Sequence, residues 1–279
     1  MFGTVIAAFL DAEWVTAGRP DRFDVIEVGA GPGTLARTVL AAGPECGEAL
    51  RYTAVEVSDA QRERHPDGVM SVAQVPDGEL SGVVLANELL DNLPFRLAVY
   101  DGSWRESFVV AGSEVLSAPF NPSPSVLPDA ASHGARAPLV DSASRFVIDV
   151  LGRLSGTLVL FDYFTATTAE LVSRPWRDWL RTYRAHERGG HYLAAPGSQD
   201  ITCEVPLDQL PTPDAVRSQA HWLALHGIDD LVDEGRRLWM EQASRPGLEA
   251  MRMRSRISEA EALTDSTGLG GFTVAEWRR

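Results

Sequence analysis

The feature that most constrains the fold of this chain is the stretch 23–40, in which an apolar run leads into spaced glycines and then into a helical pattern. Its first six residues are mostly apolar and β-branched, as in a strand that is buried on both faces, and its last seven carry apolar side chains at helical spacing. Gly29, Gly31 and Gly33 between them permit a sharp turn and the close approach of a ligand to the backbone. This order predicts a loop that binds a nucleotide-type ligand at the start of a helix.

A second acid follows at the end of the next expected strand, residues 51–57. Glu56 lies about twenty residues beyond the glycine loop, where a carboxylate can accept hydrogen bonds from both ribose hydroxyls. The glycine spacing differs from the dinucleotide fingerprint G-x-G-x-x-G, because the loop reads E-x-G-x-G-x-G with Pro32 between the last two glycines. NAD and FAD therefore fit this loop poorly.

The E-x-G-x-G-x-G form resembles motif I of class I S-adenosylmethionine methyltransferases. In that motif the leading acid, here Glu27, helps to hold the methionine amino group, and the loop leaves room for the adenosine. The simpler alternative is that the glycines only shape a tight turn, but the presence of both Glu27 and Glu56 in register favours the cofactor. The expected S-adenosylmethionine-binding residues are Glu27, Gly29, Ala30, Gly31, Gly33, Thr34, Glu56 and Asn87.

Composition narrows the possible partners. The chain has 279 residues with 44% hydrophobic content, enough for a packed core. A net charge of −14 argues against a nucleic-acid partner, since clustered Lys and Arg provide that affinity, and weakly favours a cationic substrate. Cys46 and Cys203 are far apart and belong to no Cys/His cluster, so we expect no metal site and two buried thiols. No stretch is apolar enough for a membrane span and residues 2–10 read as a helix beside the first strand, so we expect a cytoplasmic protein.

Candidate catalytic residues come directly after the strand expected at 81–86. Ligands bind at the carboxyl ends of strands in a doubly wound sheet, so Asn87 and Glu88 should face the site, with Asp91 close behind. The alternative is that Asn87 caps a short helix and the two acids lie on its solvent-exposed face. We expect Glu88, Asn87 and Asp91 to be the catalytic residues.

A hairpin is predicted at 95–110, where Asp101, Gly102 and Ser103 provide a turn signal. The range 113–138 is rich in Pro, Ser and Ala and reads as a long loop. A helix at 141–154 precedes a buried strand at 156–163, whose terminal Asp162 and Tyr163 are possible acceptor-side residues or ordinary strand-end hydrogen-bonding groups.

The rest of the sequence contains segments that a minimal doubly wound fold does not need. We expect a single domain over 1–279, with an inserted cap on the acceptor side at 165–200 and a helical insertion at 207–264. The cap contains His186, a possible acceptor-side residue, although a lone histidine is more often structural. Residues 271–277 are expected to form the final strand, at the edge of the sheet.

Four segments together resemble the MidA family, whose mitochondrial members are protein-arginine methyltransferases needed to assemble respiratory complex I. They are EVGAGPGTLA at 27–36, ANELLDNLP at 86–94, YRAH at 183–186 and PGSQDIT at 196–202. The resemblance implies a Rossmann-like class I methyltransferase fold. Such a fold has a mostly parallel seven-stranded sheet with helices on both faces, here with an added hairpin and a helical cap region. It also implies S-adenosylmethionine as donor and a protein arginine as acceptor, with a respiratory-complex subunit as a candidate substrate.

Two departures from the family accompany this resemblance. Family members usually carry a segment ahead of the position where this sequence begins, and Phe164 replaces the glycine usual after the Asp-Tyr strand end. The expected mechanism is in-line displacement at the sulfonium methyl, with Glu88 as the first choice for the carboxylate that orients the acceptor and receives its proton, and Asp91 as the second. Other functions left open are a noncatalytic assembly protein and a small-molecule methyltransferase.

Overall fold

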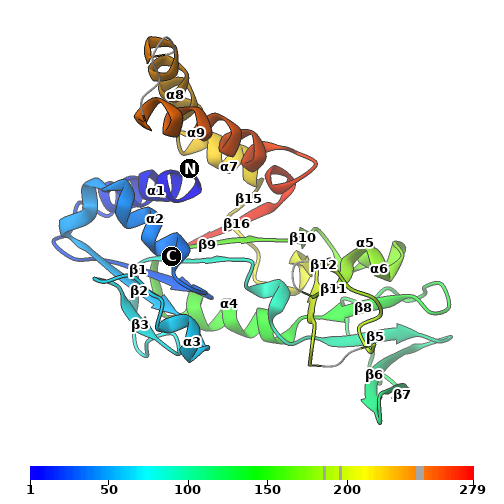
Figure 1. The fold of residues 1–279 in the computed structure, drawn as a ribbon. Helices are drawn as coiled ribbons and strands as arrows, with labels where there is room; N and C mark the ends of the chain where they lie inside the picture. The colour runs from blue at the N-terminus through cyan, green and yellow to red at the C-terminus, as the bar shows by residue number, and fades with distance from the viewer. Residues whose placement is uncertain (185–186, 195–196, 243–247) are drawn as a thin grey trace. The chain divides into compact units, whose positions relative to one another are not determined.

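The computed structural model describes residues 1–184, 187–194, 197–242 and 248–279, and its chain divides into two compact units (Figure 1). Unit 1 contains residues 1–87, 153–161 and 213–279, and unit 2 contains residues 88–152 and 162–212. The chain passes from unit 1 to unit 2 at Asn87–Glu88 and again at Phe161–Asp162. Each unit therefore consists of segments that are distant in the sequence.

Unit 1 is built on a seven-stranded sheet. Strand β1 pairs in parallel with β2 and β4, β4 pairs in parallel with β9, and β2 with β3. The expected mostly parallel sheet is confirmed. In sheet order its strands are β15 (Ala215–Ser218), β16 (Thr273–Arg278), β9 (Leu154–Asp162), β4 (Leu80–Asn87), β1 (Phe23–Val28), β2 (Leu50–Val55) and β3 (Met70–Val72).

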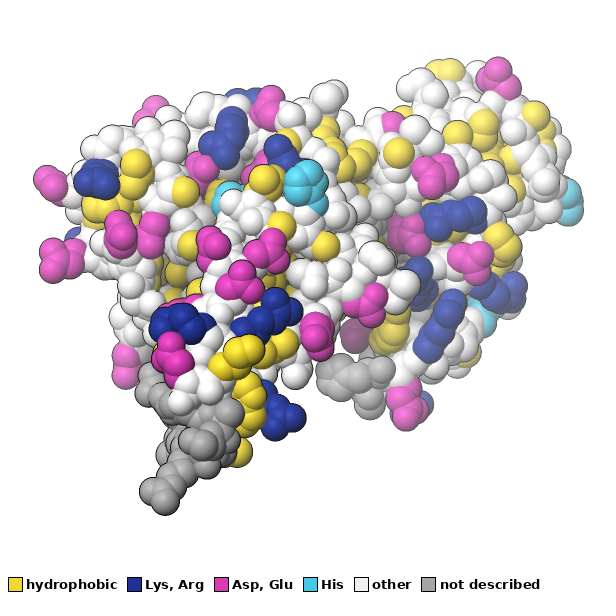
Figure 2. Space-filling view, turned by 90° about the horizontal axis from the view of Figure 1, so that it is seen from above, with side chains coloured by type: hydrophobic (Ala, Val, Ile, Leu, Met, Phe, Trp, Pro, Cys, Tyr) yellow, Lys and Arg dark blue, Asp and Glu magenta, His cyan; other side chains and the backbone are white. Residues whose placement is uncertain are grey.

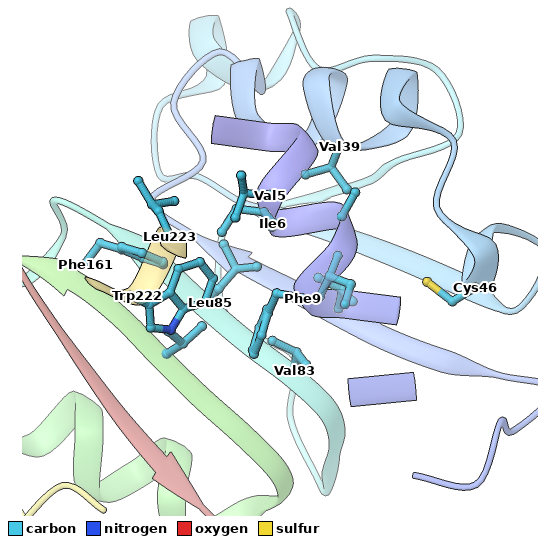
Figure 3. Close-up of a cluster of buried hydrophobic side chains, with 14 of the residues drawn as sticks. Val5, Ile6, Phe9, Val39, Cys46, Val83, Leu85, Phe161, Trp222 and Leu223 are labelled. Carbon is cyan, nitrogen blue, oxygen red and sulfur yellow. The ribbon is translucent and has the colours of Figure 1, made fainter. Parts of the chain in front are cut away.

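Helices cover one face of this sheet with the main core of unit 1 between them (Figure 3). Phe9 of α1 and Phe161 of β9 both contact the ring of Trp222 from α7, and all three side chains are fully or almost fully buried. Burial of large apolar side chains is the main stabilising contribution here. The helices of unit 1 are α1 (Phe2–Thr16), α2 (Thr34–Ala42), α3 (Asp59–Arg62), α7 (Gln219–Leu225), α8 (Ile228–Gln242) and α9 (Leu248–Thr264), with 3₁₀ turns η1 (Glu45–Glu48) and η4 (Leu269–Gly271).

The expectation of a final edge strand is wrong, because β16 lies between β9 and β15. Strand β15 pairs antiparallel with β16 and takes the edge position, within the range expected to be a helical insertion. The physical reason for this position of β15 is a group of polar contacts around Glu276 of β16, which is 6% exposed. Its carboxylate accepts hydrogen bonds from Arg217 Nη1 (2.6 Å) and from Trp222 Nε1 (3.1 Å).

Unit 2 contains a four-stranded antiparallel sheet in the order β7, β6, β5, β8. The predicted hairpin is confirmed as β5 (Arg96–Tyr100) and β6 (Trp104–Val110). The long loop expected at 113–138 is wrong at both ends, where β7 (Ser113–Pro119) pairs with β6 and β8 (Arg136–Leu139) pairs with β5. Pairing at the two edges of the sheet tolerates the prolines that suggested a loop.

The rest of unit 2 consists of the long helix α4 and of short elements (Figure 1). The described part of the cap range 165–200 contains the short helices α5 and α6 and the strands β11 and β12, and β11 pairs antiparallel with both β12 and β13, which begins at Asp200. These elements are η2 (Leu90–Asn92), α4 (Asp141–Arg153), β10 (Phe164–Thr165), α5 (Thr168–Ser173), α6 (Trp176–Trp179), β11 (Leu180–Arg184), β12 (Glu187–Arg188), β13 (Asp200–Cys203), β14 (Val205–Pro206) and η3 (Leu207–Gln209).

Acidic and basic side chains are interspersed on the molecular face drawn in Figure 2. Both cysteines are buried free thiols, as expected from the sequence. Among the described residues, none of the helices has the length and apolar content that crossing a bilayer requires.

Candidate functional site

The glycine loop joins β1 to α2 in a conformation that side chains disfavour. Gly29, Gly31 and Gly33 have φ values of 75°, 52° and 73°, all in the left-handed region. The backbone N–H of Gly29 and that of Ala30 both donate to the carbonyl of Val55 at the end of β2, at 2.9 and 3.0 Å. A Cβ on Gly33 would lie 2.9 Å from Cδ of Pro66. The turn therefore requires glycine for both conformational and steric reasons.

Glu27 is a buried acid at the end of β1, with only 5% of its surface exposed. The hydroxyl of Tyr52, on the neighbouring strand β2, donates a 2.8 Å hydrogen bond to Glu27 Oε2. Burial raises the pKa of Glu27 to about 7, and the Tyr52 hydrogen bond opposes this rise only in part. A cationic group placed next to this carboxylate would supply the charge that the site lacks.

Glu56 supports the glycine loop directly. Its Oε2 accepts the N–H of Gly31 at 2.9 Å, and its Oε1 accepts the N–H of Ser58 at 2.9 Å. The carboxylate therefore joins the end of β2 to the middle of the loop, and each of its oxygens keeps a second lone-pair direction for a hydroxyl donor.

A cavity of about 620 Å³ opens beside this loop within unit 1. Of the residues expected to bind the cofactor it is lined by Glu27, Gly29, Ala30, Gly31, Thr34 and Asn87, whereas Gly33 and Glu56 support the loop without lining the cavity. Its volume lies in the range of small-molecule sites. The buried carboxylate, the exposed loop backbone and this volume together fit a nucleoside with a cationic amino-acid tail.

Helix α9 forms a wall of the same cavity that the sequence did not reveal. Glu259, Ala262 and Leu263 line it, together with Leu35 and Thr38 of α2. These α9 residues lie more than two hundred positions after the glycine loop, and α9 has no motif that marks it as a ligand wall. Only the helical spacing of its apolar residues provided a signal, and that spacing is equally typical of a core helix.

Unit 2 has its own cavity, of about 470 Å³. Carboxylates and aromatic rings dominate its lining, and Arg181 is the one basic side chain among the described residues that line it. The acids are Glu88, Asp91, Asp200 and Glu204, and the aromatic side chains are Tyr163, Trp179 and Tyr183. This combination suits a cation, through ion pairing and contact with aromatic faces.

Glu88 begins unit 2 in a strained conformation. Its φ is 53°, in the left-handed region that a residue with a Cβ seldom adopts. The hydroxyl of Tyr163 lies 3.4 Å from Glu88 Oε2, and the side-chain amide of Asn92 donates to the Glu88 carbonyl at 3.2 Å. Strain of this kind is concentrated at functional sites, where the surrounding structure holds it in place.

Asp91 and Asp162 form a buried acidic pair behind Glu88, with 3% and 1% of their surfaces exposed. Asp162 Oδ2 accepts the N–H of Leu90 at 2.7 Å, and its Oδ1 accepts its neighbour Tyr163 N–H at 2.9 Å. Burial raises the pKa of both carboxyls, and the charges of Asp162 and Glu88 raise the pKa of Asp91 further. Asp91 lines the cavity, whereas Asp162 does not.

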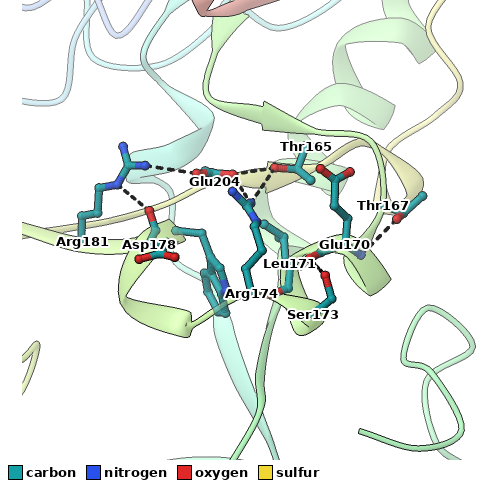
Figure 4. Close-up of polar contacts among 10 residues, drawn as sticks. Thr165, Thr167, Glu170, Leu171, Ser173, Arg174, Asp178, Arg181 and Glu204 are labelled. Atoms are coloured by element: carbon teal, nitrogen blue, oxygen red, sulfur yellow. Dashed lines mark hydrogen bonds and ion pairs between the residues drawn. The ribbon is translucent and has the colours of Figure 1, made fainter. Parts of the chain in front are cut away.

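The wall of the unit 2 cavity contains an ion-paired network centred on Glu204 (Figure 4). Its carboxylate accepts hydrogen bonds from Arg174, from Arg181 (3.1 Å) and from the Thr165 hydroxyl (2.6 Å). Arg181 Nε also donates to the carbonyl of Asp178, and its guanidinium lies 5.9 Å from the centre of the Tyr163 ring.

The residues predicted as the site are thus divided between the units. The expected cofactor residues lie in unit 1, and Glu88, Asp91 and Tyr163 line the unit 2 cavity. His186 lies outside the described residues, so its predicted role stays a prediction. Among the described residues, no group of three or more His, Cys, Asp or Glu side chains is arranged to hold a metal ion.

Comparison with known proteins agrees with this geometry. Residues 5–225 match the model of the family described as "Putative S-adenosyl-L-methionine-dependent methyltransferase". A relative from Drosophila melanogaster, "Protein arginine methyltransferase NDUFAF7 homolog, mitochondrial", is 25% identical, and the match covers 74% of this chain. The chain spans about half, 55%, of the length of that relative.

Two crystal structures of proteins from one superfamily in Burkholderia thailandensis are similar over the whole of this chain. One has a TM-score of 0.82 at 24% identity, with 79% of its own chain covered, and is similar in fold. The other is bound to S-adenosyl-homocysteine and has a TM-score of 0.80 at 25% identity, with 76% of its chain covered. These findings confirm the Rossmann-like fold, the resemblance to the MidA family and S-adenosylmethionine as the cofactor. The chain belongs to the S-adenosyl-L-methionine-dependent methyltransferase family whose model it matches.

Proposed function

We propose that this methyltransferase transfers a methyl group to an arginine side chain of a protein, with its donor in the unit 1 cavity and its acceptor in the unit 2 cavity. The observation that carries the proposal is the lining of the unit 2 cavity, to which the described residues contribute four carboxylates, three aromatic side chains and a single guanidinium, that of Arg181. The name of the Drosophila relative supports an arginine acceptor.

The donor roles follow the chemistry of each side chain. Glu27 pairs with the ammonium group of the donor, and this pairing relieves the cost of its buried charge. Glu56 accepts the ribose hydroxyls while it keeps the glycine loop in place. Gly29, Ala30 and Gly31 present backbone without obstructing side chains, and Thr34 and Asn87 complete the polar lining.

The acceptor roles follow from the guanidinium group. It is planar and has five N–H donors, and its pKa above about 12 means that it enters the cavity charged. The guanidinium of Arg181 already makes both kinds of contact that favour such a group. It lies over the Tyr163 ring and donates a hydrogen bond to the carboxylate of Glu204. Glu88 and Asp91 are the carboxylates that we assign to the incoming arginine, and Asn87 and Glu88 are consecutive residues that line the donor and the acceptor cavity respectively.

S-adenosylmethionine supplies an electrophilic methyl group on a sulfonium, so the protein mainly needs to orient the acceptor and take up one proton. Tyr163 and Glu88 fix the plane of the guanidinium through an aromatic face and an ion pair. We propose a protein substrate, and the family resemblance implies a respiratory-complex subunit.

A small-molecule acceptor is the second candidate, because a cavity of about 470 Å³ can also enclose a small cation. The acidic lining favours a basic peptide over an apolar metabolite. A noncatalytic assembly role would preserve donor binding without methyl transfer.

The test is methyl transfer from labelled S-adenosylmethionine to arginine-containing peptides, with mass spectrometry to locate the methyl group. Glu88→Gln is expected to lower transfer by tenfold or more and to leave S-adenosylhomocysteine binding unchanged. Glu106→Gln is the matched control, because Glu106 of β6 pairs with Arg96 of β5 and does not line the cavity. Unchanged transfer in Glu88→Gln, or methylation of small amines but not of peptides, would contradict the proposal.

A further inference from the structure

We infer that Asp91 is the carboxylate that receives the proton from the acceptor nitrogen, that Asp162 is the residue that positions it, and that Glu88 orients the acceptor. This inference rests on the proposed function and deepens it, because it gives a separate role to each of three acids. The sequence named these acids as candidates but did not distinguish their roles. It follows from the different contacts and exposure of the three side chains.

Asp91 combines deep burial with access to the cavity. It is 3% exposed and yet lines the cavity, so the part of its side chain that is accessible faces the acceptor space. Its Oδ1 accepts a hydrogen bond from the Asn92 side-chain amide at 2.8 Å. Among the described residues it has no ion pair with an arginine or a histidine.

Both carboxylate oxygens of Asp162 accept hydrogen bonds from the backbone. Its two oxygens accept the N–H groups of Leu90 and Tyr163, which lie on either side of the acidic pair in sequence. The Leu90 hydrogen bond fixes the first residue of η2, the turn that carries Asp91. Asp162 is therefore placed to hold Asp91 in position, and it does not itself line the cavity.

The charged and titratable groups that face the pair are mainly acids. The charges of Asp162 and Glu88 raise the pKa of Asp91. The charges of the two aspartates raise the pKa of Cys203 on β13, and the charge of Asp91 raises the pKa of Tyr163. Glu204, which follows β13, also acts on Cys203, but its own charge is balanced by Arg174 and Arg181. These two arginines are thus engaged elsewhere, and the pair keeps a strong tendency to take up a proton.

Glu88 has the opposite character. Its side chain is exposed and its backbone is in the strained left-handed conformation, which places it at the start of unit 2 beside the Tyr163 hydroxyl. An exposed carboxylate is well suited to pair with an incoming guanidinium. We therefore assign to Glu88 the orientation of the acceptor.

Atoms and charges balance in the proposed step. The acceptor nitrogen loses its N–H proton to a carboxylate oxygen of Asp91 and uses the released electron pair to form a bond to the methyl carbon. The carbon–sulfur bond breaks and its electron pair goes to sulfur, which becomes a neutral thioether. The product guanidinium keeps its single positive charge, and Asp91 later releases the proton to water.

The rate of methyl transfer should depend on pH through Asp91. This side chain accepts a proton only when it is ionised, so the rate rises with pH through its pKa, which burial and its acidic neighbours place above the ordinary carboxyl range of about 4. Removal of the Asp162 charge lowers the pKa of Asp91. It therefore moves the part of the pH–rate profile in which the rate rises, the rising limb, to lower pH. A purely structural loss at Asp162 would instead reduce the rate equally at every pH.

The experiment measures kcat and KM against pH for arginine-peptide methylation by the wild-type chain and by Asp91→Asn, Asp162→Asn and Glu88→Gln. We expect Asp91→Asn to lose the rising limb and at least a hundredfold in kcat, and Asp162→Asn to move the limb to lower pH. We expect Glu88→Gln to raise KM and to keep the limb. A limb retained in Asp91→Asn, a limb lost in Glu88→Gln, or a uniform loss in Asp162→Asn would overturn the assignment.

Two further measurements keep the result unambiguous. Carboxyl ¹³C NMR of the wild-type chain is expected to show signals of both Asp91 and Asp162 titrating above the ordinary aspartate range, and one of the two is expected to be missing in Asp91→Asn. Persistence of both signals in that variant would overturn the inference even if the variant were inactive. If the wild-type chain binds S-adenosylhomocysteine but transfers no methyl to arginine peptides, the proposed function fails. An active wild-type chain with an intact limb in Asp91→Asn means that only this inference fails.

Discussion

Substitution of Glu27 by Gln should stabilise the protein at neutral and alkaline pH while it weakens donor binding. Glu27 is 5% exposed, and burial raises its pKa from 4.5 to about 7. Because the folded-state pKa is the higher one, the favourable contribution to the free energy of unfolding is complete below the unfolded pKa. It is lost as pH rises towards about 7. The glutamine side chain of the variant does not titrate and keeps an oxygen that accepts the Tyr52 hydrogen bond.

The size of the effect follows from the shift. The pKa of Glu27 lies about 2.5 above its ordinary value, and at about 1.4 kcal/mol for each pKa unit this difference corresponds to about 3.5 kcal/mol, so the variant should gain up to this amount over wild type between about pH 4.5 and about pH 8. Loss of a charge-assisted hydrogen bond to the donor ammonium costs about 1.5–3 kcal/mol, or roughly 10- to 100-fold in affinity.

The assay combines urea unfolding at about pH 5 and about pH 8 with calorimetric titration of S-adenosylhomocysteine. Asp24→Asn is the matched control, because Asp24 lies on the same strand, pairs with Arg22 and does not line the cavity. The reasoning is refuted if Glu27→Gln shows the same pH dependence of stability as wild type, or if it keeps full affinity for S-adenosylhomocysteine.

Three further predictions concern conformation and packing. Gly33→Ala places a Cβ 2.9 Å from Pro66 at a φ of 73°, and urea unfolding should show a loss of about 1–2 kcal/mol together with weaker donor binding. Glu88→Gly relieves the φ of 53° but adds chain entropy to the unfolded state. Its stability should therefore stay within about 1 kcal/mol of wild type while peptide methylation falls; a large loss of stability would argue against strain. Trp222→Phe removes a fully buried indole and its hydrogen bond to Glu276, and thermal unfolding should show a loss of about 2–4 kcal/mol, whereas an unchanged midpoint would contradict the packing described.

Local patterns predicted the donor side of the fold well. The order of strand, glycine loop and helix at Phe23–Val28 and Thr34–Ala42 can be read from the sequence because backbone freedom and apolar spacing are local properties. The hydrogen bond from Tyr52 to Glu27 could not be read in this way, since it depends on the register between β1 and β2. The α9 wall depends on packing between segments more than two hundred residues apart.

The acceptor side was less predictable because its polar residues work through pairing. Arg174 and Arg181 resemble ordinary surface charges in the sequence, and only the fold brings them to Glu204. Asp162 was identified as a strand-end polar residue, but its use as a backbone acceptor for Leu90 depends on a contact across 72 residues. The strands at 113–119 and 136–139 were missed because pairing with β6 and β5 overrode a loop-like composition.

Hydrogen exchange with and without S-adenosylhomocysteine tests most directly whether the donor occupies the unit 1 cavity. We expect the added ligand to slow exchange in the loop that carries Gly29 and Gly31, in α2 beside Thr38, and in α9 around Leu263, because these segments line the cavity. The hairpin of β6 and β7 should exchange at the same rate in both conditions. Protection that is absent from the glycine loop and α9, or confined to other segments, would contradict the assignment of this cavity to the methyl donor.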